Sequence, residues 1–439
     1  MRILKNSREI RAFLRLLRKR ASGGSGKIED AVKKILADVR KRGDDAVIGY
    51  TRKFDSLKKR DFRLTPAEVT RYANKADKKI VKSLEISAGR IRTFHELQRE
   101  KSWIVSDPGN RKSRKQGFPP LALLGQVVRP LERVGVYVPG GKASYPSTVL
   151  MNVIPAQVAG VEEIALCVPS PGGTVNPYVM AAVRMLGLRE VYRVGGAQAV
   201  AAMAYGTRTI RRVDKIVGPG NIYVALAKKL VFGEVDIDMI AGPSEVLVIA
   251  DKTADPRFIA ADLLSQAEHD ELASSVLITD SAALATRVRE ELSRQLSGLK
   301  RASIVRKSIG AYGAILLTRN MEEAVGFSNE IAPEHLEVMT RDPFSLLPLI
   351  RNAGAIFLGP WTPEPLGDYA AGPNHTLPTG GTARFFSPLG VYDFMKRSSL
   401  LSFSREAFLK LADTVITLSE IEGLNAHGKT IRVRYEKEV

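Results

Sequence analysis

The sequence predicts an α/β protein with two Rossmann-like parallel-sheet domains, an N-terminal helical arm and a C-terminal helical tail. Beyond residue 130, short apolar strands alternate with helical segments, which is typical of parallel βαβ units. The chain has 439 residues, too many for one ordinary hydrophobic core, so more than one domain is expected. No GxGxxG loop follows any strand, so the usual dinucleotide-binding fingerprint is absent.

The first 20 residues are basic and predict an amphipathic helix. Its apolar side chains fall on one face: Ile10, Phe13, Leu14 and Leu17. The segment lacks the continuous apolar core and the cleavage site of a secretory signal. We expect a helical arm that ends in a flexible linker at residues 21–27. Residues 28–100 then place apolar side chains three and four positions apart, which predicts further helices.

Two sets of apolar strands follow this helical part. Those of the first set run into Gly or Pro and cover residues 133–141, 162–171, 190–196 and 214–221. Those of the second set cover residues 245–251, 274–280, 313–318 and 353–359. Parallel βαβ units place ligands at the carboxyl ends of their strands, so we expect sites there. Past residue 395 the pattern returns to a helix and a basic tail.

The composition is that of a soluble globular protein, with 44% hydrophobic and 26% charged residues. No apolar run is long enough to cross a membrane. The single cysteine, Cys167, cannot form an internal disulfide, which is consistent with a reducing cytoplasm. A net charge of +19 could attract nucleic acid. However, the basic residues are dispersed, with residues 1–20 and 99–116 the densest stretches, and no nucleic-acid-binding motif occurs. Specific nucleic-acid binding is therefore not favoured.

Four of the five histidines lie in polar or Gly/Pro-punctuated clusters: His269, His335, His375 and His427. Imidazole is the commonest protein ligand for transition metals and the usual proton carrier near neutral pH. Any one cluster is compatible with a solvated surface. Four together favour a metal site.

The segment DPRFIAADLLSQAEHDE predicts a helix with Asp255 as its N-cap and Pro256 at its first position. Gln266 and His269 are three residues apart, so their side chains project from the same face. Gln is an unusual ligand for zinc, which prefers Cys, His and carboxylates. The pattern by itself favours a solvated helix face.

The segment NEIAPEHLEV contains an adjacent acid and base. Pro333 predicts an extended Ala332 and a new helix, with Glu334 and His335 in its first turn. A helix N-terminus would lower the pKa of the imidazole. The two side chains could activate water and shuttle protons, or Glu334 could simply favour the helix dipole beside an incidental histidine.

Two further segments carry candidate polar residues. Residues 359–381 form a long Pro/Gly-rich loop after a buried strand, and a loop of this length is usually functional or disordered. Asp368 and His375 are its candidates. Near the C-terminus, Glu422 and His427 are each followed by a glycine and suggest a tail that reaches into a site, in this subunit or a neighbour.

Glycine-rich strand ends could bring backbone NH groups close to a pyrophosphate, although the pattern by itself favours tight turns between strand and helix. They occur in GVYVPGG, VGGAQAV and VGPGNIYV. Ser244 follows a Gly-Pro turn, where a helix N-cap is the alternative interpretation.

Six long segments, taken in order, resemble the histidinol dehydrogenase family: VGPGNIYVALAKK, IDMIAGPSEVLVIAD, DLLSQAEHD, NEIAPEHLEV, GPWTPEPLGDYAAGPNHTLPT and EGLNAHGKTIRVR. The similarity covers nearly the whole chain from about residue 28. The resemblance implies a zinc-containing, NAD-dependent enzyme of histidine biosynthesis. Such an enzyme oxidises L-histidinol through the aldehyde to L-histidine with two NAD.

The resemblance also assigns roles to residues of this sequence. It implies a zinc ion bound by Gln266, His269, Asp368 and His427, which accounts for the unusual glutamine. Glu334 and His335 match the acid–base pair. The positions that match NAD contacts are Tyr137, Gln198 and Asn221. The positions that match substrate contacts are Ser244, Gln266, His269, His335, Asp368, His375, Glu422 and His427.

The same resemblance implies a cytoplasmic homodimer with shared active sites and suggests how the chain divides. The expected parts are an arm and linker (1–27), a discontinuous catalytic domain (28–132 with 243–395), an NAD-binding domain (133–242) and a tail that contributes to the partner subunit's site (396–439). We expect zinc to hold the substrate by its imidazole and amine nitrogens. His335 would remove the hydroxyl proton in the first oxidation, and Glu334 would activate water for the second.

Two alternatives remain open at this stage. A paralogous dehydrogenase could use the same scaffold to oxidise another polar alcohol, such as a polyol or a sulfonated diol. His375 and Glu422 argue against it, because they suit a cationic substrate that carries an imidazole. A non-enzymatic nucleic-acid binder rests only on the net charge. The choice between zinc and manganese, and between NAD and NADP, does not follow from residue spacing.

Overall fold

The computed structural model describes the residues 1–21, 26–57, 61–106, 122–140 and 145–435. The predicted linker at 21–27 and the basic stretch at 99–116 fall partly outside them. The chain forms two compact units. Unit 1 comprises Met1–Gln98 and Leu131–Phe394, and unit 2 comprises Arg99–Pro130 and Met395–Val439. Each unit is described by itself below.

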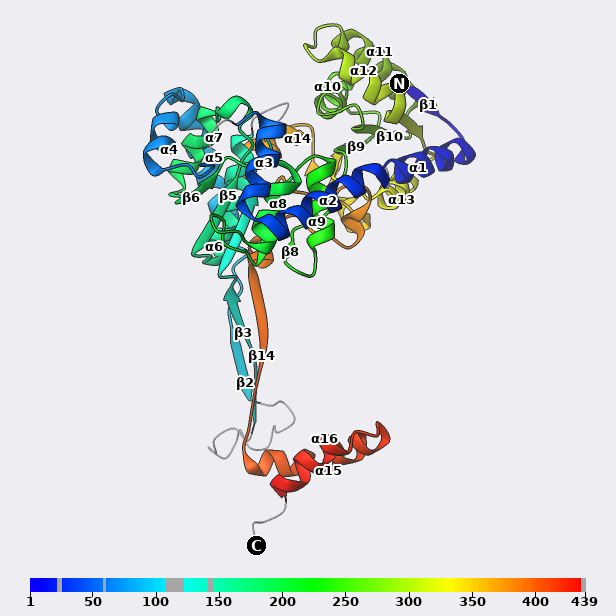
Figure 1. Ribbon diagram of the computed structural model, residues 1–439. Coiled ribbons are helices and arrows are strands. Elements are labelled where there is room, and N and C mark those ends of the chain that lie inside the picture. The colour runs from blue at the N-terminus through cyan, green and yellow to red at the C-terminus, as the bar shows by residue number, and fades with distance from the viewer. Residues whose placement is uncertain (22–25, 58–60, 107–121, 141–144, 436–439) are drawn as a thin grey trace. The chain divides into compact units, whose positions relative to one another are not determined.

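Unit 1 contains a six-stranded parallel sheet in the order β1-β11-β10-β9-β12-β13. Figure 1 labels β1, β9 and β10 of this sheet. Its strands are β1 (Arg2–Leu4), β9 (Glu245–Ala250), β10 (Ser274–Thr279), β11 (Ala314–Leu317), β12 (His335–Met339) and β13 (Ala355–Leu358). The four strands of the second predicted set are β9, β10, β11 and β13. The sequence analysis missed β1, which is only three residues long, and β12, for which it predicted a helix.

Helices cover both faces of this sheet. On one face lie α10 (Pro256–Ala267), α11 (Ala282–Leu296) and α12 (Ala302–Tyr312). On the other face lie α1 (Ser7–Ala21) and α13 (Met321–Ile331). Successive strand residues point to opposite faces, so Val248 packs toward α10 while Ile249 packs toward α1. The near-continuous apolar character of β9 follows from this burial on both sides.

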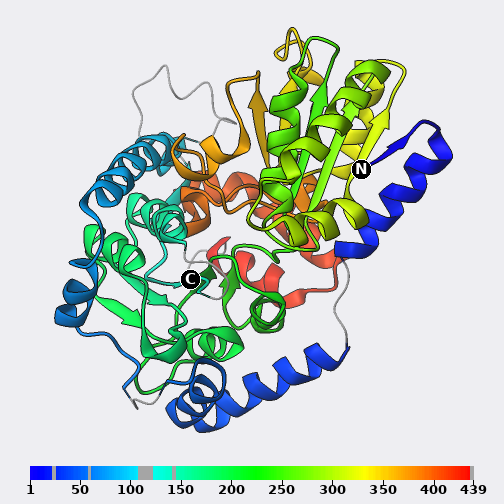
Figure 2. The same ribbon diagram turned by 90° about the horizontal axis from the view of Figure 1, so that it is seen from above.

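The N-terminal helix is part of this sheet's core. The apolar face predicted for α1 is confirmed, because Ile10, Phe13, Leu14 and Leu17 are all buried against the strands. The chain enters through β1, which pairs with β11 at the sheet edge. Figure 2 shows the blue N-terminal strand and helix beside the green and yellow strands of the sheet.

A second, five-stranded parallel sheet in unit 1 has the order β6-β5-β4-β7-β8. Its strands are β4 (Arg133–Tyr137), β5 (Glu163–Cys167), β6 (Glu190–Tyr192), β7 (Lys215–Val217) and β8 (Asp236–Ile237). The first predicted set of strands is confirmed as β4 to β7. Cys167 is fully buried in β5, as predicted. Two parallel sheets therefore confirm the predicted α/β class.

Two groups of helices surround this second sheet. One group packs against Ala165, Cys167 and Ile216 and consists of α2 (Gly26–Arg42), α3 (Asp44–Asp55), α8 (Gly196–Tyr205) and α9 (Ile222–Val231). The other consists of α4 (Pro66–Ala73), α5 (Lys78–Glu96), α6 (Pro146–Ala159) and α7 (Pro177–Met185). These helices pack against one another, and α6 also packs against β4.

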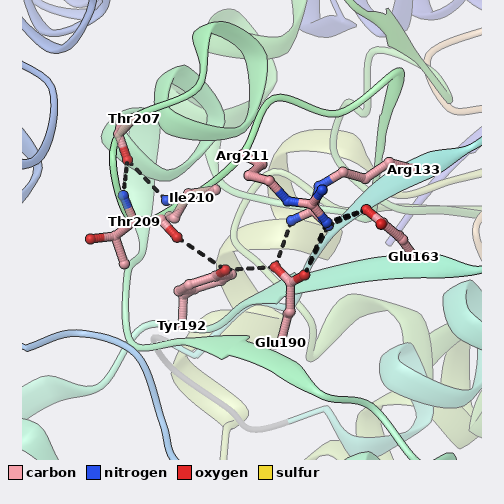
Figure 3. A network of polar contacts seen from close by, with 8 residues as sticks. All are labelled: Arg133, Glu163, Glu190, Tyr192, Thr207, Thr209, Ile210 and Arg211. Carbon is pink, nitrogen blue, oxygen red and sulfur yellow. Dashed lines mark hydrogen bonds and ion pairs between the residues drawn. The ribbon is translucent and has the colours of Figure 1, made fainter.

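The amino ends of β4, β5 and β6 are tied together by a polar network (Figure 3). Arg133, Glu163 and Glu190 each begin one of these strands. The Arg133 guanidinium lies 2.8 Å from a Glu163 carboxylate oxygen and 2.6 Å from one of Glu190. The Tyr192 hydroxyl donates to the same Glu190 carboxylate at 2.7 Å. These contacts occupy the amino edge of the sheet and leave its carboxyl edge for ligands.

Unit 2 is built from a three-stranded antiparallel sheet and two helices. Its elements are β2 (Trp103–Ser106), β3 (Ala122–Pro130), β14 (Met395–Phe403), α15 (Arg405–Ile421) and α16 (Asn425–Tyr435). The helix predicted past residue 395 is confirmed as α15, with Ser404 as its N-cap. The strands and α16 were not predicted. β14 lies far from β2 and β3 in the sequence, and β2 and β14 carry mostly exposed side chains, so these two strands lack the apolar pattern of a buried strand.

Candidate active site

Glu334 and His335 lie at the start of a strand, so the helix predicted for them is wrong. His335 is the first residue of β12, which is buried along its whole length between β9 and β13. The prediction of an extended Ala332 is wrong. This residue adopts a left-handed φ of 52° and caps α13, and its NH donates to the Ser328 carbonyl. Pairing with two neighbouring strands outweighs the helix signal from Pro333, because it satisfies the backbone groups of a buried segment.

The backbone of Glu245 holds both members of the predicted acid–base pair. Its NH donates to Glu334 Oε2 at 2.8 Å, and its carbonyl lies 2.9 Å from His335 Nδ1. A carbonyl only accepts, so Nδ1 carries the proton and Nε2 is the nitrogen that faces the site. Glu334 and His335 lie at the amino end of β12, beside Glu245 at the amino end of β9. The sequence analysis expected the carboxyl ends of the strands.

Two carboxylates of α14 (Glu364–Tyr369) face His335. The Nε2 atom lies 3.6 Å from Asp368 Oδ1 and 3.8 Å from Glu364 Oε1. The ligand atoms of the three side chains lie within 4.8 Å of one another, so they could hold a metal ion. The predicted loop 359–381 therefore contains a short helix, which brings Asp368 to the site.

Burial and mutual charge perturb these groups strongly. Burial raises the pKa of Glu334 to about 7, partly opposed by His335. Burial would lower the pKa of His335, but the charges of Glu334 and Asp368 outweigh it and raise it to about 10. Burial and the neighbouring Asp368 raise the pKa of Glu364 to about 8. The prediction that a helix N-terminus lowers the pKa of His335 is wrong, because carboxylates surround the ring instead.

Gln266 and His269 lie at the end of α10, whose predicted N-cap, Asp255, is confirmed. The Gln266 side chain is buried, and neither its amide nitrogen nor its oxygen has a hydrogen-bond partner among the described residues. The His269 NH donates to the Gln266 carbonyl at 3.2 Å, one turn further on. Burial lowers the pKa of His269, and the charge of Asp368 opposes this shift. A buried amide without partners is expected to have a ligand.

His375 and Ser244 join the same region. His375 Nδ1 lies 3.1 Å from the Asp368 carbonyl, so it donates there. Ser244 directly precedes β9 and caps no helix, contrary to the alternative interpretation of its turn. The structure thus brings together five of the predicted residues: His269, Glu334, His335, Asp368 and His375. Gln266 lies one turn before His269, and Ser244 is the chain neighbour of Glu245.

The sequence analysis missed a group of buried acids beside the site: Glu245, Asp262, Glu337 and Glu364. Glu337 Oε1 accepts from the Glu364 NH at 2.8 Å and so holds the start of α14. Burial raises the pKa of Glu337, and burial raises that of Asp262 to about 6. Two of these acids could have been found in the sequence, because Glu245 and Glu337 are the single glutamates of the largely apolar strands EVLVIA and HLEVM.

Of the three residues predicted to contact NAD, Tyr137 is the last residue of β4, and Gln198 and Asn221 follow the carboxyl ends of β6 and β7. The Tyr137 hydroxyl accepts from the Gly196 NH at 3.1 Å, and the adjacent Gln198 is buried with its side-chain oxygen lacking a partner in the described part of the chain. Asn221 is exposed, and its side chain caps α9 by accepting from the NH groups of Tyr223 and Val224. The Asn221 side chain therefore has a local structural role as well.

Glu422 and His427 belong to unit 2. Glu422 is the C-cap of α15 and His427 lies in the first turn of α16. Both are exposed. His95, the fifth histidine, is fully buried in α5, and its Nδ1 lies 2.8 Å from the Ile91 carbonyl.

Comparisons with known proteins agree with one another. A family model described as histidinol dehydrogenase matches residues 18–435. A histidinol dehydrogenase of Syntrophotalea carbinolica is 55% identical over 409 residues, 93% of this chain and 92% of that protein. One of Aquifex aeolicus is 54% identical over 428 residues, 96% of each chain. The crystal structure of histidinol dehydrogenase from Elizabethkingia anophelis is similar with a TM-score of 0.91 and 35% identity, over 99% of this chain and 98% of that one. None of the described helices has both the length and the apolarity that crossing a membrane requires.

Proposed function

This chain belongs to the histidinol dehydrogenase family of NAD-dependent oxidoreductases, and we propose that it oxidises L-histidinol to L-histidine in two steps. One L-histidinol, two NAD⁺ and one water give L-histidine, two NADH and three protons. The observation that carries the proposal is the buried cluster in which His335 contacts Glu334 and Asp368. It combines a proton acceptor with carboxylates that suit a cationic substrate and a metal.

The residues of the site fit a zinc ion. We propose Gln266, His269 and Asp368 as ligands from one subunit and His427 as a ligand from its partner. The two unpartnered polar atoms of the buried Gln266 side chain support this assignment, since burying them without a ligand is costly. The group His335, Glu364 and Asp368 offers a second set of donors next to the first. When bound, zinc would act as a Lewis acid toward the nitrogen atoms of the substrate, and its positive charge would favour a neutral His335.

His335 is suited to take the hydroxyl proton in the first oxidation. Its Nδ1–H is committed to the Glu245 carbonyl, so the exchangeable position is Nε2, which faces the site. The substrate alcohol would lie within hydrogen-bond reach of this atom while the adjacent carbon gives its hydride to NAD⁺. The hydrogen bond at Nδ1 fixes the ring and keeps Nε2 available.

Glu334 is suited to activate water for the second oxidation. Burial places its pKa at about 7, where a carboxyl group can both accept and return a proton. Attack of water on the aldehyde gives a hydrate, which yields the second hydride. Because the side chain is nearly closed to solvent, the aldehyde would be held in place between the two steps.

We propose that NAD binds at the carboxyl edge of the five-stranded sheet. Tyr137 and Gln198 lie at this edge, and the glycine-rich turn that ends at Asn221 follows β7 there. The free side-chain oxygen of Gln198 is available for a polar contact with the cofactor. This arrangement needs no GxGxxG loop.

A homodimer is part of the proposal. Apolar residues three or four apart lie exposed along α15: Leu411, Val415, Leu418 and Ile421. Trp103, Ile104 and Val105 of β2 are also exposed. Exposed apolar surface of this kind marks an interaction site, and a second copy of the chain would bring in Glu422 and His427. A cytoplasmic location also belongs to the proposal, since Cys167 requires no oxidising compartment.

The decisive experiment measures the NADH formed per L-histidinol consumed. Two NADH per substrate, lost with a chelator and restored by zinc or manganese, is the expected result. One NADH would mean that the aldehyde escapes, and the role of Glu334 would be wrong. No NADH from folded, metal-loaded protein would contradict the substrate, and a panel of polyols and sulfonated diols would then identify the alcohol used.

A further inference from the structure

Arg20, the penultimate residue of α1, has a completely buried side chain. Its guanidinium forms an ion pair with the Glu245 carboxylate. The other terminal nitrogen donates to the Leu272 carbonyl at 2.6 Å and reaches the Ser244 carbonyl at 3.5 Å. The planar fork of the guanidinium therefore holds the side chain of Glu245 and the backbone just before it at the same time.

Such a pair is a poor means of stabilising a fold. Removing two charges from water costs several kcal/mol per ion, and well-packed apolar residues often do as well or better. Neighbouring residues of α1 pack without this desolvation cost, since Leu14 and Leu17 bury apolar side chains against the same sheet. A buried charged contact at this one position therefore calls for a role beyond packing.

Glu245 connects this contact to the chemistry. Its NH bonds Glu334, and its carbonyl bonds His335, so the position of its backbone sets where both side chains lie. Its own carboxylate forms its ion pair with Arg20, and the backbone of Glu334 and Gly380 also lies close to it. The contacts form one continuous series, from α1 through Arg20 and Glu245 to the acid–base pair.

We infer that Arg20 is a positioning residue for Glu334 and His335, acting through Glu245. The inference rests on the proposed function. It means that the N-terminal helix is part of the active-site framework. A displacement of about 1 Å at a reacting group can cost about 100-fold in rate, so losing the fork should lower kcat and leave substrate binding nearly intact.

The test compares Arg20→Met with Arg18→Met in the full-length, metal-loaded enzyme. Methionine keeps the length and apolar part of the side chain but removes the charged fork. Arg18 is the matched control, because it lies on the same helix and pairs with Glu330 at 2.9 Å, with its side chain 62% exposed. We expect kcat of Arg20→Met to fall on the order of 10- to 100-fold with little change in KM, while Arg18→Met stays within about twofold of wild type.

Two further measurements separate positioning from folding. Arg20→Lys restores the charge without the fork, so its kcat should lie between those of wild type and Arg20→Met. Glu245→Gln should lower kcat, and the double variant Arg20→Met/Glu245→Gln should be no slower than Arg20→Met alone. A folded Arg20→Met enzyme with wild-type kcat, or additive losses in the double variant, would overturn the inference.

A readout that does not depend on turnover keeps the inference distinct from the proposed function. The Nδ1 proton of His335 can be followed by NMR with ¹⁵N-labelled histidine. We expect its signal to shift or broaden in Arg20→Met and to stay in place in Arg18→Met. An unchanged signal in Arg20→Met would contradict positioning, whereas inactivity of the wild-type chain on L-histidinol would contradict only the proposed function.

Discussion

The Lys228 ammonium and the Asp238 carboxylate form a buried ion pair. Only 2% of the Lys228 side chain and 1% of the Asp238 side chain is exposed. Both groups also bond the backbone of Gly218. Lys228 Nζ donates to its carbonyl at 3.0 Å, and Asp238 accepts from its NH at 2.8 Å. Gly218 begins the turn that ends at Asn221, on the carboxyl edge of the five-stranded sheet. The pair thus fixes the turn that we propose to contact NAD.

Replacing one member of this pair should cost both stability and cofactor binding. In Lys228→Met, the buried Asp238 keeps its charge without a neighbouring cation, so the free energy of unfolding should fall by about 3–5 kcal/mol. The Kd for NAD should rise as the turn loosens. Urea unfolding and cofactor titration measure the two effects.

Two variants control this prediction. Lys229→Met changes the exposed neighbouring lysine and should leave both quantities unchanged. The double variant Lys228→Met/Asp238→Leu removes both charges and should recover part of the stability, because no unpaired charge remains. A double variant less stable than Lys228→Met would show that the pair itself stabilises the fold.

Gly218 also has a backbone that only glycine tolerates. Its φ is 110°, and an added Cβ would lie 2.1 Å from the Tyr137 carbonyl oxygen. Gly218→Ala should therefore displace the turn or Tyr137, and weaken NAD binding at least tenfold. Gly233→Ala is the matched control, since its φ is 101° and an added Cβ meets nothing within 4 Å. It should cost only the left-handed strain of about 1–2 kcal/mol. Equal losses in the two variants would argue against the clash.

Much of the fold could be predicted from the sequence because its pattern is local. Buried parallel strands such as β9 and β10 appear as apolar runs, and Asp255 with Pro256 signals the start of α10 directly. The failures involve long-range pairing. β12 was predicted as a helix because Pro333 is a strong local signal, whereas its strand pairing is set by residues far away in the chain.

The candidate site was predicted through family motifs more than through chemistry. Spacing alone did not distinguish Gln266 from a solvated residue, and its burial became visible only in the fold. The role of Glu245 could not be predicted at all, because it acts through its backbone. Its side chain also depends on Arg20, 225 residues away in the sequence.

Glu334→Gln should separate the two oxidations. The variant keeps the shape of the side chain but cannot accept a proton, so oxidation of supplied histidinaldehyde should fall by a factor on the order of 10²–10⁴. The first oxidation should be affected less, because His335 performs its proton transfer. Stopped-flow measurement of NADH from each substrate checks this. A normal rate with the aldehyde would rule out water activation by Glu334.

Gln266→Leu should reduce the metal content of the purified protein. Leucine is close in volume and suits a buried position, so the fold should tolerate it, whereas the amide oxygen is lost as a ligand. Metal content by mass spectrometry should fall well below one per subunit after dialysis. Gln295→Leu, on α11, serves as the control. Full zinc occupancy in Gln266→Leu would favour the second donor set of His335, Glu364 and Asp368.

The network at the amino edge of the five-stranded sheet predicts a dependence of stability on pH. The hydrogen bond from Arg133 lowers the pKa of Glu190 from 4.5 to about 2. A carboxyl group with a lowered pKa binds its proton more weakly in the folded state, so its stabilisation is complete above pH 4.5 and is lost as the pH falls toward 2. Glu190→Gln should therefore lower the free energy of unfolding at pH 7, by about 1–2 kcal/mol after allowing for solvent screening of a side chain that is 20% exposed.

Urea unfolding of wild type and Glu190→Gln between pH 7 and pH 3 tests this dependence. The difference between them should stay constant down to about pH 4.5 and narrow below it, because Glu190 of the unfolded wild-type chain then takes up a proton while the folded-state carboxylate stays charged. Glu162→Gln, at an exposed position beside β5, should unfold like wild type throughout. A difference that persists unchanged to pH 3 would mean that Glu190 stabilises the sheet through its shape and neutral hydrogen bonds rather than through its charge.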